Sequence, residues 1–283
     1  MRPHFGAALF SVLLAAVQAV AAEDRVTWYV TDHPPFFITE GPQAGQGSGD
    51  LQMRWLTAHL PNFDHHFEQV STNRLLYDFE HQDGLCTINI IRTEERKKFM
   101  LFNNRPIPMP SWNLIVAADR KAKIAPHLTE AGEADLERMA RDGRLVGAYV
   151  PGRHYPAPVL ALIADPAKAV RLEMVPQTSP MFNLLHGGRV DFVLGLPQET
   201  QYYAQRFQDS LPLEVIPIKS APASIDVYLA CSDQPVGRTV IARIDALLQE
   251  EKSWSDYVSF LSPWMTKTEF AVALAGRPLP HQP

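Results

Sequence analysis

The chain has 283 residues, of which 46% are hydrophobic and 20% are charged, and its formal net charge is −5. This composition is typical of a globular protein, and the length suggests about two domains. A negative net charge without a basic cluster provides no electrostatic footprint for nucleic acid, so we expect no nucleic-acid partner.

The first 22 residues predict a secretory signal peptide. A short, weakly basic start is followed by an apolar run over 5–16, and small residues at Val20 and Ala22 suit cleavage before Glu23. The apolar run is too short to span a bilayer well, and it contains no Cys that could carry a lipid. We therefore expect a mature protein that is exported to the periplasm, with no lipid anchor.

Strand and helix patterns alternate along the rest of the chain. Asp50 is expected to cap the first helix, and Ser179, followed by Pro180, a later one. The expected strands cover 26–30, 67–70, 85–91, 112–118, 145–150, 170–175, 190–194, 213–218 and 225–230. The expected helices cover 50–60, 73–81, 134–140, 157–164, 179–186, 198–207, 236–248 and 253–265. Such alternation predicts an α/β protein with largely parallel sheets.

The segment 88–106 carries the strongest candidate for a binding residue. An apolar strand ends in Thr93-Glu94-Glu95-Arg96, where Thr93 is a good helix N-cap and the two acids suit a first turn. A short helix would place the Arg96 guanidinium beside unpaired backbone N–H groups, which is a good arrangement for holding an anion. The segment taken alone favours a surface pairing of Arg96 with Glu94, Glu95 or a neighbouring helix.

The two cysteines, Cys86 and Cys231, both lie in apolar, strand-like runs. Export permits a disulfide between them, and two buried free thiols are the alternative. Of the ten histidines, His65 and His66 are the densest pair, but neighbours on an extended segment point to opposite faces. We expect neither a metal nor a cofactor.

In four segments the chain resembles the periplasmic solute-binding proteins of ABC transporters, specifically the amino-acid-type family 3. The resemblance extends over about 26–264 and rests on the order and spacing of the segments. The segments are Pro34-Pro35-Phe36 followed by Gly47 and Gly49, Thr93-x-x-Arg96 followed by Phe102 and Pro106, the pair 146–152 and 184–191, and the strand 225–230.

The resemblance implies a type II periplasmic-binding fold. Each lobe would be a mostly parallel sheet flanked by helices, with the ligand cleft between the lobes and closure by a hinge motion. We expect lobe 1 at 23–113 plus 228–275, lobe 2 at 114–227, and a flexible tail at 276–283. The chain would cross between lobes near 112–116 and return near 225–229.

The resemblance also implies a ligand site centred on Arg96, which matches the family's clamp for a carboxylate. Phe36 would form an apolar wall, the 152–155 loop would meet the ligand, and Asn89 is the polar residue left in the strand before Arg96. Leu196 stands where the family often has an acid, so a carboxylate group is implied and an ammonium group is not. The expected ligand-binding residues are Asp32, Phe36, Asn89, Thr93, Arg96, Arg153, His154 and Tyr155.

The leading hypothesis is therefore a monomeric periplasmic protein that binds a small anionic solute, an amino acid or a carboxylate, and delivers it to an ABC permease or a membrane sensor. The alternative is an enzyme similar to cyclohexadienyl dehydratases, with a general acid or base among Asp32, His33 and His154. An interaction-only protein, with a closed cleft that leaves no room for a ligand, is the third possibility.

Overall fold

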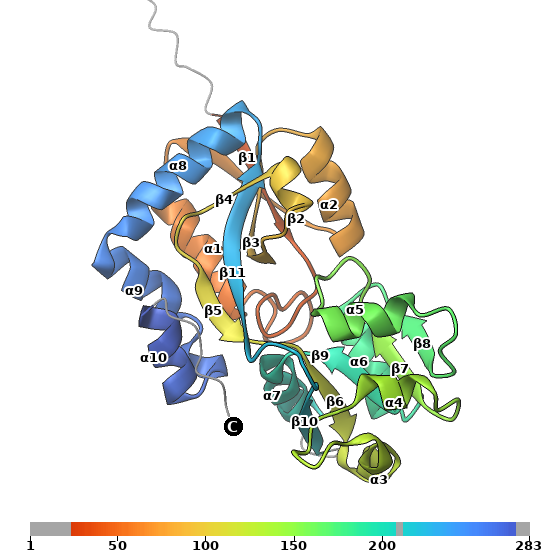
Figure 1. Cartoon of the computed structure of the whole chain (residues 1–283). Coiled ribbons are helices and arrows are strands. Elements are labelled where there is room, and N and C mark those ends of the chain that lie inside the picture. The colour runs from red at the N-terminus through yellow and green to blue at the C-terminus, as the bar shows by residue number, and fades with distance from the viewer. Residues whose placement is uncertain (1–23, 208–211, 276–283) are drawn as a thin grey trace, which may run out of the picture.

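Two β-sheets divide the chain into two lobes (Figure 1). The computed structural model describes residues 24–207 and 212–275. The predicted signal peptide and the predicted tail at 276–283 lie outside the described residues. No helix in the described part is both long and apolar enough to cross a membrane.

The first lobe is built on a six-stranded sheet with the order β2-β1-β3-β11-β4, in which β5 also pairs with β11. Its strands are β1 (Asp24–Val30), β2 (Phe63–Gln69), β3 (Leu85–Ile91), β4 (Met100–Phe102), β5 (Ile107–Pro110) and β11 (Ser224–Ser232). Its helices are α1 (Ser48–Ala58), α2 (Thr72–His81), α8 (Pro235–Gln249), α9 (Glu251–Ser259) and α10 (Lys267–Ala275).

The second lobe contains a five-stranded sheet with the order β10-β6-β9-β7-β8. Its strands are β6 (Asn113–Ala117), β7 (Val146–Tyr149), β8 (Arg171–Met174), β9 (Phe192–Gly195) and β10 (Leu213–Pro217). Its helices are α3 (Lys121–Ile124), α4 (Leu136–Ala140), α5 (Ala157–Ala164), α6 (Thr178–His186) and α7 (Pro197–Arg206). The α/β, two-lobed architecture is thus as predicted.

Both sheets are mixed, although the sequence predicted mostly parallel ones. The parallel pairs are β1 with β2 and β3, and β7 with β8 and β9. Each antiparallel pair contains β11 or β6. These are the strands next to the crossings between the lobes, and they run antiparallel to the neighbouring strands of the βαβ units. The sequence pattern shows where strands and helices occur, but it does not show the direction in which each strand runs in its sheet.

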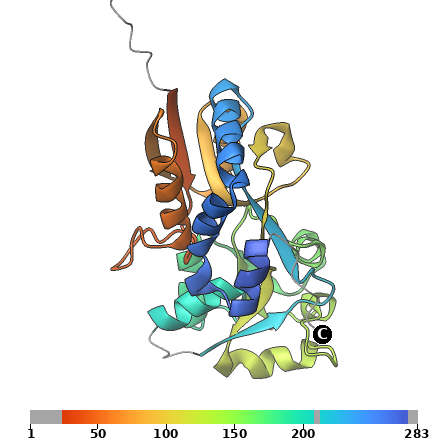
Figure 2. The ribbon, with the colours of Figure 1, turned by 90° about the vertical axis from the view of Figure 1, so that its left-hand side faces the viewer.

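The chain crosses between the lobes twice, side by side. It leaves the first sheet after Pro110 and enters the second at Asn113, and it returns between Pro217 and Ser224. Ser224 already pairs with Pro110, so the return lies a few residues before 228, the expected start of the lobe 1 segment. Figure 2 shows β11 extending from this junction into the first lobe.

Each lobe has an aromatic-rich core. In the first lobe, Trp28 and Trp254 are almost fully buried, and a disulfide joins Cys86 of β3 to Cys231 of β11 with an S–S distance of 2.06 Å. In the second lobe, Phe182 stacks on Tyr203 with ring centroids 4.0 Å apart. These cores fix the two rigid bodies whose facing edges form the candidate site.

The structure corrects two predicted helix starts and adds one helix that was not predicted. α1 begins at Ser48, and Asp50 lies inside its first turn, where its carboxylate accepts the Gly47 N–H at 2.9 Å. α6 begins at Thr178, and Ser179 donates to another residue instead of capping the helix. The last described helix is α10, which the sequence analysis missed because its apolar residues lack a clear one-sided pattern.

Candidate ligand site between the lobes

Arg96 lies at the junction of the two lobes and is only 8% exposed. The predicted short helix is a three-residue 3-10 turn, Arg96–Lys98, and the Thr93 hydroxyl accepts the Arg96 N–H at 3.2 Å. The sequence predicted that the guanidinium would lie beside unpaired helix N–H groups, and the structure shows a different arrangement. The guanidinium donates instead to carbonyl oxygens, through Nη1 to Ile91 at 2.7 Å and through Nη2 to Gly152 at 3.1 Å.

The Arg96 charge has no counter-charge in contact. Among the described residues, no carboxylate lies within ion-pair distance of Arg96, and the surface pairing with Glu94 does not occur, because Glu94 pairs with Lys97. Burial lowers the pKa of Arg96 to about 10, and the nearby charge of Glu95 opposes this shift. A guanidinium has five N–H donors, so Arg96 keeps donors for an incoming anion.

Gly152 brings the second lobe against the first. It has a φ of +81°, and a Cβ there would come within 2.5 Å of Asn73 Oδ1 at the start of α2. Only glycine allows both this backbone conformation and this close approach. The Gly152 carbonyl can therefore reach Arg96, so the structure shows the lobes in contact.

Asp32 forms a second bridge between the lobes. It lies just after β1, and its carboxylate accepts the Ser179 N–H at 3.0 Å and the Ser179 hydroxyl at 2.9 Å. Its backbone carbonyl accepts the Thr178 hydroxyl at 2.9 Å. Asp32 thus occupies the N-terminus of α6, where a negative charge is favourable.

Arg153, Glu199 and His33 form a buried polar cluster beside Asp32. The Arg153 side chain is 8% exposed and that of Glu199 is fully buried; Arg153 Nη1 donates to Glu199 Oε1 at 3.0 Å. Arg153 Nη2 also donates to the Thr178 hydroxyl. His33 Nε2 lies 3.0 Å from the same Glu199 oxygen, but without the angle of a hydrogen bond. Burial raises the pKa of Glu199. The charge of Arg153, together with His33 and the Leu196 N–H, outweighs this effect and holds the pKa below its ordinary value.

A cavity of about 260 Å³ opens at this junction. Both lobes line it, since Ile91 and Arg92 come from the first and His154 from the second, and Trp112, Asp226 and Tyr228 complete the main part of the wall. Ile91 lines the cavity, and its carbonyl oxygen accepts a hydrogen bond from the Arg96 guanidinium behind it. Burial and the charge of Arg96 lower the pKa of His154, so the imidazole is neutral at pH 7.

Four of the expected site residues have structural roles in this arrangement. Asn89 has a φ of +57° at a β-bulge opposite β11, a conformation that asparagine tolerates. The Tyr155 hydroxyl is held by the Val150 backbone, Phe36 is a core residue, and Thr93 orders the Arg96 turn. Arg96, Arg153, His154 and Asp32 are the ones that the structure gathers at the junction.

Sequence reasoning missed Glu199 and Trp112 as site residues. Glu199 follows Pro197 at the start of α7, so it fits an ordinary helix start, and its Oε2 does accept the Leu196 N–H at 2.7 Å. Trp112 lies at the crossing between the lobes, between β5 and β6. Its indole Nε1 is buried and has no hydrogen-bond partner in the structure, and Arg153 lies over its ring at 5.4 Å.

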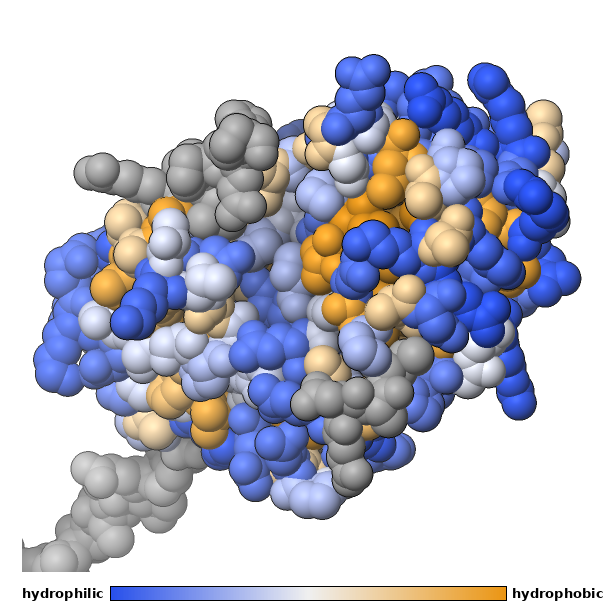
Figure 3. Space-filling model, turned by 90° about the horizontal axis from the view of Figure 1, so that it is seen from below, coloured by the Kyte–Doolittle hydropathy of each residue, from blue (hydrophilic) through white to orange (hydrophobic). Residues whose placement is uncertain are grey.

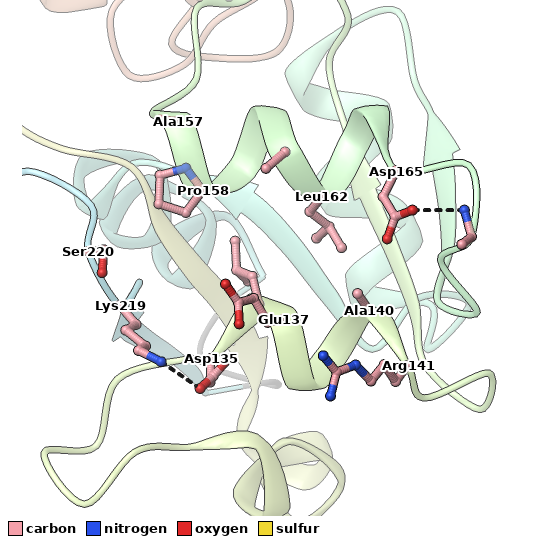
Figure 4. A pocket seen from close by; sticks show the side chains of 13 residues that line it. Asp135, Glu137, Ala140, Arg141, Ala157, Pro158, Leu162, Asp165, Lys219 and Ser220 are labelled. Atoms are coloured by element: carbon pink, nitrogen blue, oxygen red, sulfur yellow. Dashed lines mark hydrogen bonds and ion pairs between the residues drawn. The ribbon is translucent and has the colours of Figure 1, made fainter.

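A larger cavity of about 520 Å³ lies elsewhere, on the second lobe between α4 and α5 (Figure 4). Its floor is apolar, and Lys219 pairs with Asp135 at its edge at 3.0 Å. Seen from below, apolar residues on this lobe gather within a hydrophilic border (Figure 3). None of the expected site residues lines this cavity.

The histidines in the described part of the chain do not gather around a metal position. His65 Nδ1 lies 3.0 Å from Trp28 Nε1, and His66 pairs with Asp64 at 2.9 Å. Within residues 24–207 and 212–275, no group of three or more His, Cys, Asp or Glu side chains is placed to hold a metal ion.

Comparison with solved structures places this geometry in a known architecture. An arginine transport system periplasmic binding protein from Legionella pneumophila is 17% identical with a TM-score of 0.61, and the match covers 86% of this chain and 100% of that one. An amino acid ABC transporter substrate-binding protein from Streptococcus pneumoniae, bound to L-arginine, is 13% identical with a TM-score of 0.64, covering 89% and 96%. The chain has the fold of these periplasmic binding proteins.

A third similar structure is an ancestral amino-acid-binding protein described as a precursor of cyclohexadienyl dehydratase, at 15% identity and a TM-score of 0.63, covering 86% and 96% of the two chains. No protein-family model matches the sequence, and no curated protein sequence matches it. At these identities the likeness shows the fold, and each neighbour's ligand is a property of that neighbour.

Proposed function

We propose that this protein binds a small anionic solute between its lobes and delivers it to an ABC permease or a membrane sensor. The observation that carries the proposal is the buried Arg96 guanidinium, which has no carboxylate partner. A buried charge without a counter-charge is costly, and a ligand carboxylate would provide that counter-charge in a bidentate pairing. The two-lobed fold supports the same function, because such folds enclose ligands by hinge closure.

The cavity at the junction supports binding over an interaction-only role. Its volume of about 260 Å³ accommodates a small solute, and both lobes contribute to its wall. Arg92 and His154 line it with polar side chains, Arg96 lies behind the lining residue Ile91, and the exposed Asp226 is the one carboxylate among the lining residues. The predicted export would place this binding in the periplasm, with a monomer as the working form.

Calorimetry and thermal-shift titration of the mature chain with small carboxylates and amino acids test the proposal. A bound carboxylate should raise Tm, because a ligand that binds only the folded state stabilises it. Arg96→Ala should abolish this shift, and Lys98→Ala is the matched control, since it removes an exposed charge from the same turn. Unchanged binding of the same compound by Arg96→Ala would refute the proposal.

The alternative function is a dehydratase-like enzyme, which the third structural neighbour brings into view. Two of its candidate groups are already engaged, because Asp32 holds the start of α6 and His33 lies against Glu199. His154 is the exposed candidate. Mass spectrometry of compounds recovered after incubation separates the functions: unaltered compound supports binding, and a dehydrated or decarboxylated product supports the enzyme.

A further inference from the structure

The two buried carboxylates at the junction are both committed to protein partners. Asp32 accepts the Ser179 N–H and hydroxyl, and its Oδ1 lies 3.4 Å from the Thr39 hydroxyl. Glu199 accepts from Arg153 and lies against His33 through Oε1, and it accepts the Leu196 N–H through Oε2. A ligand ammonium would therefore find no free buried carboxylate here.

Arg153 is the residue that commits Glu199. It comes from the loop after β7 and crosses to the start of α7, where the two side chains form a buried pair of opposite charge. Arg153 also donates to Thr178 and lies near the ring of Trp112. Because Arg153 already occupies Glu199 Oε1, this carboxylate is not available to an ammonium or a guanidinium from a ligand.

The remaining charge at the junction is positive. Arg153 and Glu199 neutralise each other, Asp32 is held at the helix N-terminus, and Arg96 alone among these four lacks a partner of opposite charge or a helix end. The Trp112 N–H is a further buried donor without an acceptor. An anion satisfies this set of donors, whereas a buried ammonium without a carboxylate is strongly disfavoured.

We infer that the Arg153–Glu199 pair makes the site selective for carboxylates that carry no ammonium group. The inference rests on the proposed function, and it narrows the ligand class from amino acids and carboxylates to carboxylates alone. The exposed Asp226 at the cavity rim lies beside solvent and close to Arg92, so it offers an ammonium only a screened interaction.

The wild-type protein can test the inference with pairs of probes that differ only in the amino group. Glutarate is compared with L-glutamate, and butanoate with L-2-aminobutanoate, by calorimetry at pH 7.5. The member without the amino group should bind at least roughly ten-fold more tightly, because the ammonium must be desolvated without a partner. Equal or tighter binding of the amino acids overturns the inference.

Arg153→Met then tests which residue provides the selectivity. Freed from Arg153, Glu199 can accept an ammonium, so the preference for the deaminated probe should fall by roughly ten-fold or more. Arg153→Met combined with Glu199→Gln removes the acid and should restore the preference. Glu251→Gln, which neutralises an exposed carboxylate of α9 outside the cavity lining, is the control and should leave the preference unchanged. If Arg153→Met leaves the preference unchanged, the role assigned to Arg153 is wrong. If that variant does not fold, the comparison of paired probes on the wild-type protein decides whether the site is selective.

The outcomes also separate the inference from the proposed function. If the amino acids bind as tightly as their partners and Arg96→Ala abolishes both, the proposed function stands and the inference fails. If no probe binds in a manner that depends on Arg96, both fail.

Discussion

Arg96 Nη2 donates a hydrogen bond to the carbonyl oxygen of Gly152, 3.1 Å away, and this contact joins the first lobe to the second. The guanidinium that we propose to hold the ligand is thus also a contact between the lobes. Ligand binding and lobe closure share one residue, so an anion that pairs with Arg96 can favour the closed arrangement over the open one.

Gly152→Ala should open the lobes. Its Cβ would come within 2.5 Å of Asn73 Oδ1, and its φ of +81° is strained for alanine. The matched control is Gly132→Ala, where φ is +80° but a Cβ meets no atom within 4 Å. Both changes should cost about 1–2 kcal/mol through the backbone, but only Gly152→Ala should enlarge the radius of gyration in small-angle scattering. Equal radii for the two variants would contradict the contact.

Breaking the Arg153–Glu199 pair from one side should destabilise the fold more than removing both charges. Arg153→Met leaves Glu199 buried and unpaired, which typically costs about 3–5 kcal/mol. Arg153→Met combined with Glu199→Gln should recover much of that loss, because no buried charge remains. Denaturant unfolding of the single and double variants measures the coupling, and additive effects would show that the two side chains act independently.

Stability should fall as the pH decreases below about 7, because of His33 and His154. Desolvation is the main cause that lowers the pKa of His33 below its ordinary 6.5, and the charge of Arg153 adds to it, while Glu199 and Asp32 oppose it. The pKa of His154 is lowered by burial and by Arg96. Between the folded and unfolded pKa values the unfolded chain binds more protons, so stability is present above 6.5 and is lost as the pH falls through the folded values.

His33→Gln combined with His154→Gln should flatten this dependence, as measured by unfolding free energy at pH 7.5 and at lower pH. Glu199 acts in a separate window: its pKa is lowered from its ordinary 4.5, so its contribution is lost at still lower pH. A wild-type profile that matches that of the double variant between pH 5 and 7 would exclude the histidines as its source.

Reduction of the disulfide should destabilise the first lobe. Cys86 and Cys231 are separated by 145 residues, so the bond constrains a long loop of the unfolded chain, and its loss should cost about 2–5 kcal/mol. The check is urea unfolding of the protein with and without dithiothreitol, with Cys86→Ser plus Cys231→Ser as a control that should not respond to reductant. Equal stability in both conditions would argue against the bond.

The order of the elements was predictable because strand and helix patterns alternate locally. The two lobes were expected from the resemblance to periplasmic solute-binding proteins, which rests on the order and spacing of segments such as Thr93–Arg96. Strand direction was not predictable, since the reversal at β6 and β11 depends on pairing between distant strands. The cysteine pairing remained open for the same reason, because only the fold brings β3 beside β11.

The sequence singled out Arg96, which the structure places at the lobe junction, but it did not reveal the contacts around it. Ser179 has the residue type of a helix cap, yet the acceptor at the start of α6 is Asp32, which is 147 residues away in the chain. Glu199 matched a local helix-start pattern, and that pattern concealed its pairing with Arg153, 46 residues away. Asn89 was expected to face the ligand as a polar residue, whereas its positive φ at the bulge accounts for the residue type.

Calorimetric titration of the wild-type protein and of Arg96→Ala with glutarate and butanoate tests the central claim most directly. We predict that at least one of these carboxylates binds the wild-type protein and the Lys98→Ala control alike, and that Arg96→Ala does not bind it. Binding of the same carboxylate to Arg96→Ala with unchanged affinity would contradict the account.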